Sequence, residues 1–306
     1  MVERIASAVD VFCDAQDRLV AAFEAYEGAR GFQAAPWQRP GLGSGRVLVL
    51  EDGEVFERAG VNTSRVSGST MPASVVAKAP HLEGAPFTAG GISLILHPRN
   101  PYAPSFHANF RFFGVDADTW WFGGVCDMSP SYGFEDDAAH FHRVLRDWCA
   151  RHRAGDYEAW KQACDAYFTI PHRQEMRGIG GIFFDHLTDP EDGGFERCLA
   201  LAADGLDSLL PAYLPILDRR APMPYGERER HWQETRRGRY VEFNLAVDRG
   251  TRFGLETGAN IEAILVSLPP RARWSFDLRP GPGTAEASLA RFLQPRPWTH
   301  PAGHDA

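Results

Sequence analysis

Apolar and polar side chains alternate strictly in one segment of the chain. The alternating residues are Ser105, Phe106, His107, Ala108, Asn109, Phe110, Arg111 and Phe112. Successive side chains of a β-strand point to opposite faces, so the pattern predicts a strand with one apolar face and one face of imidazole, amide and guanidinium groups. Because side chains on a rigid strand are well aimed, we interpret the polar face as the floor of a pocket for an anionic ligand.

Other segments predict further strands around this one. An apolar run over about 91–97 predicts a neighbouring strand, with Ser93 and His97 on one face, and the dipeptide Asp52-Gly53 is a hairpin signal. Additional strands are predicted over 46–50, 55–61, 119–126, 239–247 and 251–256. The Gly- and Pro-rich segment 31–45 is predicted to be a loop.

Helical spacing of apolar residues alternates with these strands along the chain. Helices are predicted over 1–28, 135–152, 156–169 and 195–217, the last being interrupted near Pro211, and a short helix or an apolar turn is predicted over 261–268. Consecutive hairpins beside separate helices indicate an α+β fold, in which helices cover an antiparallel sheet. With no repeat and no long linker, we expect one domain over residues 1–306.

Composition narrows the functional classes. The net charge is −8, which argues against a general nucleic-acid-binding protein. No window reaches the roughly 18 apolar residues that a membrane-spanning helix needs, and the N-terminus has no signal-peptide pattern. The odd cysteine count and the lack of a C-x-x-C pair suggest reduced thiols, so a cytoplasmic location is expected. The cysteines are Cys13, Cys126, Cys149, Cys164 and Cys198.

Four of the 11 histidines have informative neighbours: His97, His107, His142 and His172. Imidazole is a common ligand of divalent metals. The spacing is scattered and an H-E-x-x-H motif is absent, so the pattern alone favours a hydrogen-bonded core or surface role for any single histidine. No nucleotide-binding glycine motif has the required context, so no organic cofactor is expected.

Arg111 and Asp127 form a second candidate pair. A guanidinium group binds carboxylates through two parallel hydrogen bonds, and a carboxylate can accept hydrogen bonds from pyrrole-type N–H groups while stabilising positive charge. The alternatives are a surface ion pair for Arg111 and a turn-capping role for Asp127 before Ser129-Pro130.

Several segments, in this order, resemble one enzyme family. They are GGISLILHPRNPY (90–102), SFHANFRFF (105–113), WWFGGVCDMSPSYGF (120–134), HFHR (140–143), PHRQEMRGIGGIFFD (171–185), RRGRYVEFNL (236–245) and SLPP (267–270). The chain resembles the oxygen-dependent coproporphyrinogen III oxidases of haem biosynthesis from about Pro36 to Trp298.

The resemblance implies a homodimer whose subunits each contain a large flat antiparallel sheet sandwiched between helices, with an interface including about 240–275. It implies that O2 oxidatively decarboxylates two propionates of coproporphyrinogen III to vinyl groups, giving protoporphyrinogen IX. By position, His97, His107, His142 and His172 match the family's proposed ligands of a divalent metal, and His107 matches its proton donor. The matching substrate-binding positions are Ser93, Asn109, Phe110, Arg111, Gly258, Ala259 and Asn260.

We expect Arg111 to fix a substrate carboxylate, Asp127 to contact pyrrole nitrogens, and His107 to handle the proton that leaves the propionate. One departure matters most, because many relatives have an arginine where this chain has Asn260. Another arginine, Arg252 or Arg273, would then compensate. Otherwise the substrate differs, and the chain is a paralogue acting on another pyrrole-type carboxylate. A separate alternative is a non-catalytic tetrapyrrole carrier, which would need the polar strand face but not Asp127 or His107.

Overall fold

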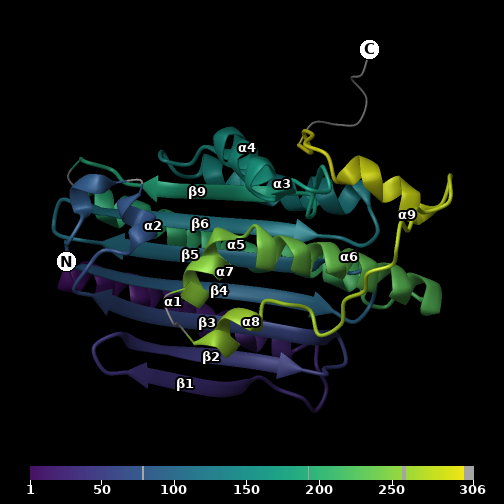
Figure 1. Cartoon of the computed structure of the whole chain (residues 1–306), viewed down its shortest axis with the longest axis horizontal. Helices are drawn as coiled ribbons and strands as arrows, with labels where there is room; N and C mark the ends of the chain where they lie inside the picture. The colour runs from purple at the N-terminus through teal and green to yellow at the C-terminus, as the bar shows by residue number, and fades with distance from the viewer. Residues whose placement is uncertain (78, 192, 257–259, 300–306) are drawn as a thin grey trace.

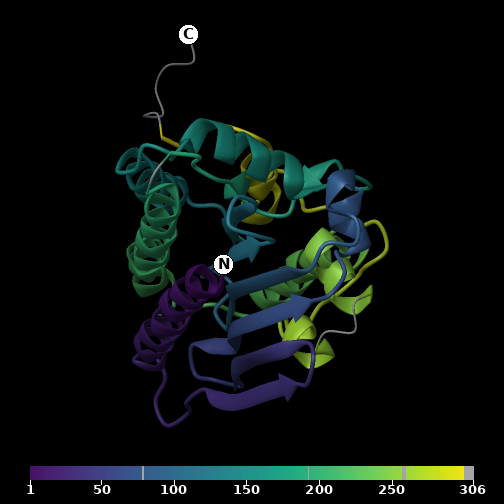
Figure 2. The ribbon, with the colours of Figure 1, turned by 90° about the vertical axis from the view of Figure 1, so that its left-hand side faces the viewer.

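The computed structural model describes residues 1–299 except 78, 192 and 257–259, without the side chains of residues 74, 253 and 256. One antiparallel sheet of seven strands lies between layers of helices (Figure 1). Figure 2, turned to show the sheet from its edge, has α1 and α5 on one side and α6, α7 and α8 on the other. The predicted α+β fold is therefore confirmed.

The strands follow each other across the sheet in the order β1-β2-β3-β4-β5-β6-β9. They are β1 Gln33–Arg39, β2 Gly43–Glu51, β3 Phe56–Gly68, β4 Phe87–Pro98, β5 Ser105–Gly114, β6 Trp120–Ser129 and β9 Gly181–Leu187. A small separate hairpin consists of β7 Thr169–Ile170 and β8 Glu175–Met176.

The helices are α1 Val2–Glu24, α2 Ala73–Val76, α3 Glu135–Ala150, α4 Tyr157–Tyr167, α5 Gly194–Arg220, α6 Glu227–Ala246, α7 Arg249–Glu256, α8 Ile261–Leu265 and α9 Ala285–Ser288. Two short 3₁₀ helices, Pro80–Leu82 and Leu289–Phe292, complete the elements of the described residues. The helices predicted near 1–28, 135–152 and 156–169 are confirmed, as is the short helix near 261–268.

Buried and half-buried side chains alternate along β5, as the sequence predicts. Phe106, Ala108, Phe110 and Phe112 are at most 1% exposed, whereas the polar residues between them are half-buried. Phe106 stacks on Tyr213 of α5 with ring centroids 4.6 Å apart, and Phe110 meets Trp148 of α3 edge to face. Each buried aromatic contributes about 1.5–3 kcal/mol, so the apolar face fixes the sheet against α1, α3 and α5.

The prediction of a loop over 31–45 is wrong, because this segment forms β1 and the start of β2. Pro36 has no N–H to donate, but it lies on an edge strand, where proline is tolerated. Gly45 allows the ring of Trp37 to lie against the strand, since a Cβ there would be 2.6 Å from Trp37 Nε1. The predicted hairpin at Asp52 is confirmed, and Asp52 adopts a left-handed φ of 55°.

The strands predicted over 239–247 and 251–256 are also wrong, because these residues lie in α6 and α7. Alternation of Val241, Phe243 and Leu245 suggested a strand, but the inward face of α6 is polar. It follows helical spacing through Arg230, Gln233, Arg237, Tyr240 and Asn244. A pattern built on apolar residues alone misses such a helix.

Helix α5 runs through Pro211 without the predicted interruption. Pro215, four residues later, has no N–H for the carbonyl of Pro211. His140 of α3 donates from Nε2 to that carbonyl at 2.9 Å. The side chain replaces the lost backbone donor, so the helix continues.

By length and composition α5 would be able to cross a membrane. Half of its most apolar window is buried inside the fold, and the helix packs on α1 and α3. These contacts are those of a core helix.

An ionic contact fixes α6 to the sheet. Glu57 of β3 is 3% exposed and accepts from Arg237 at 2.5 Å and from Arg230. Arg237 also donates to the carbonyl of Pro98 at 2.9 Å. Burial alone would raise the pKa of Glu57, but Arg237 and Arg230 outweigh it and lower the pKa below 4.5.

We predict that Arg237→Met lowers the free energy of unfolding by about 3–5 kcal/mol, because it leaves Glu57 charged and buried without its main partner. The same change at the exposed Arg153 should have little effect. Urea denaturation measures both. Because the folded-state pKa of Glu57 is depressed, the contribution of the pair should be complete above pH 4.5 and be lost as the pH falls.

Candidate active site

The antiparallel register gathers polar residues of neighbouring strands on the face opposite the apolar core. Asn109 lies opposite Ser93, His107 opposite Asp127, and Arg111 opposite Gly123. We call Ser93, His107, Asn109 and Arg111 the polar floor; all four are half-buried. The structure thus brings together four of the residues that the sequence proposed.

Helices lie over both ends of the polar floor. At one end Asn62, in the row of Ser93, donates to the carbonyl of Ala263 in α8 at 3.0 Å. At the other end α6 reaches Asp127 through Arg177, which donates to Asn244 Oδ1 at 2.7 Å. The floor therefore lies between two anchored helices.

His107 is oriented by a buried carboxylate. Its Nδ1 is 2.8 Å from Oδ1 of Asp127, which is 2% exposed. Burial alone would raise the pKa of Asp127, but Arg177 and His107 outweigh it and lower the pKa. An ionised carboxylate only accepts, so Nδ1 of His107 carries the proton. Within the part of the chain that the structure describes, Nε2 has no hydrogen-bond partner, which leaves it available for proton transfer.

Arg177 was not predicted as a site residue. Its guanidinium binds both oxygens of Asp127, at 2.9 and 2.7 Å, and lies 4.2 Å from the ring centroids of Phe168 and Tyr240. Burial would lower its pKa, but Asp127 raises it. The sequence feature that could have pointed to Arg177 is the glycine-rich segment 178–181 directly after it. A Cβ on Gly178 would be 2.1 Å from the carbonyl oxygen of Met128, so only glycine lets this segment lie against β6.

Arg111 is held by a second residue that the sequence did not single out. Its Nη2 is 3.0 Å from Oδ1 of Asp185 on β9, and its Nη1 donates to Asn109 at 3.3 Å. The guanidinium crosses β6 above Gly123, where a Cβ would be 2.7 Å from the guanidinium carbon. Arg111 remains about one-third exposed.

A comparison with protein-family models identifies the chain. Residues 7–298 match the model for coproporphyrinogen III oxidase. The chain belongs to the coproporphyrinogen III oxidase family. The suspected resemblance is thereby confirmed over nearly the whole sequence, and family membership supports a role in haem biosynthesis with coproporphyrinogen III as substrate.

Some residues assigned from the family pattern lie elsewhere. Phe110 is 1% exposed on the apolar face, because strand alternation turns its side chain away from the floor. Asn260 precedes α8 and its side chain makes no capping hydrogen bond. Arg273, one of the two arginines expected to compensate for Asn260, pairs with Glu234 of α6. Gly258 and Ala259 fall outside the described residues.

The coproporphyrinogen III oxidase pattern also suggested four metal-binding histidines, which do not converge in one chain. Among the described residues, no group of three His, Cys, Asp or Glu side chains is placed to hold a metal ion. His97 and His142 are fully buried, and burial lowers the pKa of both, that of His142 to about 3. His97 bonds Ser105 and the carbonyl of Ser267. His142 bonds the hydroxyl of Tyr157 and the carbonyl of Ile179.

His172 is half-exposed and pairs with Glu242 at 3.0 Å, far along the chain from His107. Each of these three histidines already has protein partners, so the four residues do not fit a single metal ion within one subunit.

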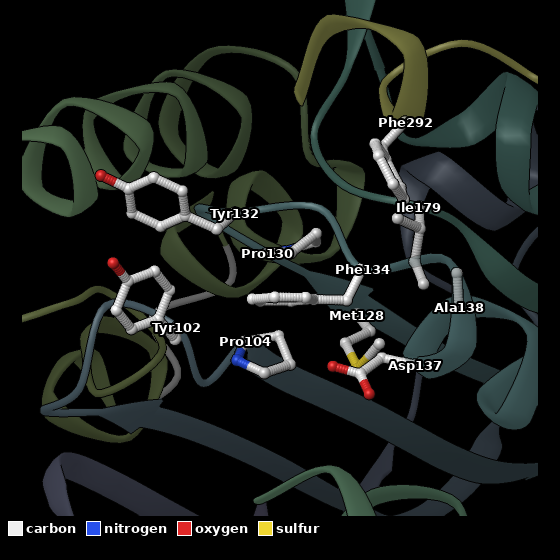
Figure 3. A pocket seen from close by; sticks show the side chains of 10 residues that line it. All are labelled: Tyr102, Pro104, Met128, Pro130, Tyr132, Phe134, Asp137, Ala138, Ile179 and Phe292. Atoms are coloured by element: carbon white, nitrogen blue, oxygen red, sulfur yellow. The ribbon is translucent and has the colours of Figure 1, made fainter. Parts of the chain in front are cut away.

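Two hollows lie away from the polar floor. Figure 3 shows one, where the hydroxyls of Tyr102 and Tyr132 point away from Met128 and Ile179; its volume of about 10 Å³ holds about one water. The other, of about 660 Å³, lies between α6 and residues 273–286. Its arginines, Arg228, Arg273 and Arg279, already pair with acidic residues.

We predict that Asp127→Asn both destabilises the fold and frees the ring of His107. Arg177 would keep its buried charge without a counter-charge, at a cost of about 3–5 kcal/mol in urea denaturation. Nitrogen-15 NMR of the imidazole should show mixed tautomers in place of one with the proton on Nδ1. Asp207→Asn, at an exposed pair with Arg18, is the matched control. An unchanged tautomer would contradict the orienting role.

Proposed function

We propose that this chain catalyses the oxygen-dependent conversion of coproporphyrinogen III to protoporphyrinogen IX, in which two propionates become vinyl groups. The observation that carries the proposal is the polar floor, in which Arg111, Asn109, Ser93 and His107 lie on one face of the sheet. A macrocycle with carboxylate arms matches this face, because a guanidinium binds carboxylates and the amide, hydroxyl and imidazole groups form hydrogen bonds.

The substrate supplies the electrons. Each propionate loses one carbon dioxide, one proton and two electrons as the vinyl group forms. Two such steps release four electrons, the number that reduces one O2 to two waters. Because a porphyrinogen is itself electron-rich, we propose O2 as co-substrate and no organic cofactor.

His107 is the proposed base. Arg111 holds the carboxylate of the reacting propionate, and Nε2 of His107 takes the proton from the carbon next to the ring as electrons leave the pyrrole. The carbon–carboxylate bond then breaks, its electron pair forms the vinyl double bond, and carbon dioxide leaves.

Direct contact between Asp127 and the pyrrole nitrogens is not part of this proposal, because both oxygens of Asp127 are engaged and its side chain is 2% exposed. Asp127 acts as a positioning residue, and no step runs through a metal.

Asn260 favours a second candidate, oxidative decarboxylation of another pyrrole-type carboxylate, because an amide supplies no charge to a fourth propionate. Turnover of coproporphyrinogen III compared with simpler pyrrole propionates distinguishes the two candidates.

We predict that the purified protein converts coproporphyrinogen III to a divinyl dicarboxylate in air and not under argon, as followed by product chromatography. His107→Gln should lower kcat at least about 100-fold, since a positioned base contributes about 10²–10⁴. Binding without turnover in air would instead support a carrier, and equal turnover under argon would exclude O2 as the oxidant.

We further propose that two copies associate through the segment 240–275 and its surroundings. Large apolar side chains are exposed there, in contrast to most of the surface. They are Leu245, Leu255, Ile261, Trp274, Phe276 and Leu278. Apolar patches of this kind mark interaction surfaces.

We predict that the protein sediments as a dimer and that Ile261→Asp shifts it toward monomer. Val2→Asp is the matched control, because Val2 is also exposed but lies on α1, across the sheet from α8. A monomeric wild type, or equal effects of both variants, would contradict this interface.

A further inference from the structure

Arg111 already has a carboxylate partner before any ligand arrives. The guanidinium lies across three strands in one transverse row, from β5 over Gly123 of β6 to Asp185 of β9. The absence of a side chain at Gly123 is what makes this path possible. The row is therefore built around the pair of Arg111 and Asp185.

A β-bulge directs Asp185 to that position. β6 and β9 pair Phe122 with Leu187 and Gly124 with Phe184, so Asp185 and His186 together face the single residue Gly123. His186 has a left-handed φ of 55° and stacks on Trp121, with ring centroids 5.0 Å apart. Bulges of this kind re-aim side chains and are common beside active sites.

Asp185 is charged when it meets Arg111. Burial alone would raise its pKa, but Arg111 and His186 outweigh it and lower the pKa. Its side chain is about one-quarter exposed, which keeps solvent and ligands in reach. A ligand carboxylate must therefore share Arg111 with Asp185 or displace it.

We propose that Asp185 is a specificity-determining residue that competes with ligand carboxylates for Arg111. The inference rests on the proposed function and deepens it. While a propionate occupies Arg111, the contact with Asp185 is weakened. Once that propionate has become a vinyl group, Asp185 pairs with Arg111 again, so the guanidinium is not left without a partner. The site thereby releases an arm that has reacted and favours one that still carries a carboxylate.

Equilibrium binding of oxidised coproporphyrin III, a tetracarboxylate that does not react, tests the proposal by fluorescence titration of the full chain. Asp185→Asn keeps the shape and removes the competing charge, so it should tighten binding about three- to tenfold. A merely structural role would weaken binding instead. In an Arg111→Gln background, Asp185→Asn should have no effect.

Unchanged or weaker binding by Asp185→Asn, or equal tightening without Arg111, would overturn the proposal. Asp204→Asn on α5 removes a carboxylate that pairs with Arg151. It controls for a general change in charge and should leave binding unchanged. Thermal unfolding verifies folding, and Asp185→Ser is a second variant that removes the charge.

Titration with glutarate, a simple dicarboxylate, separates this proposal from the proposed function. Tighter glutarate binding by Asp185→Asn, with no turnover of coproporphyrinogen III by the wild type, would support the competition at Arg111 and refute the oxidase activity. Turnover of coproporphyrinogen III by the wild type, with equal glutarate affinity of the wild type and Asp185→Asn, would support the oxidase activity and refute the competition at Arg111.

Discussion

The carboxylate of Asp127 has to be neutralised where it lies, because a charge out of contact with water is stable only beside close partners. Arg177 and His107 provide them, and each belongs to a different part of the fold. Arg177 in turn needs the rings of Phe168 and Tyr240 and the amide of Asn244. One buried charge thus joins the sheet, the glycine-rich segment 178–181 and α6. The orientation of the imidazole on the floor follows from that junction.

The sequence reveals those elements whose burial is apolar. β5 follows directly from its alternation, since one face packs into the core and the other does not. α6 does not follow, because the surface beneath it is the polar face of the sheet. Its contacts are Arg237 with Glu57, Gln233 with the carbonyl of Pro98, and Asn244 with Arg177. A helix docked by charges and amides carries no apolar stripe, so hydrophobic periodicity cannot predict it.

The candidate site divides in the same way. Ser93, His107, Asn109 and Arg111 were accessible to prediction because they share one strand face or its neighbour. Arg177 and Asp185 were not, since their partners Asp127 and Arg111 lie 50 or more residues away and only the sheet register brings them together. The four histidines proposed as metal ligands show the reverse case. They match a pattern along the chain, but folding places His107 and His142 on different faces of the sheet.

The two prolines of α5 have a consequence for how the helical layer behind the sheet assembles. Pro211 and Pro215 each leave the carbonyl four residues earlier without its usual helical donor, and for the carbonyl of Pro211 the ring of His140 provides one. Sliding α3 along α5 by a single turn would separate these two groups and break the hydrogen bond. This hydrogen bond therefore favours one axial offset between the two helices, which apolar packing alone, being non-directional, would not specify.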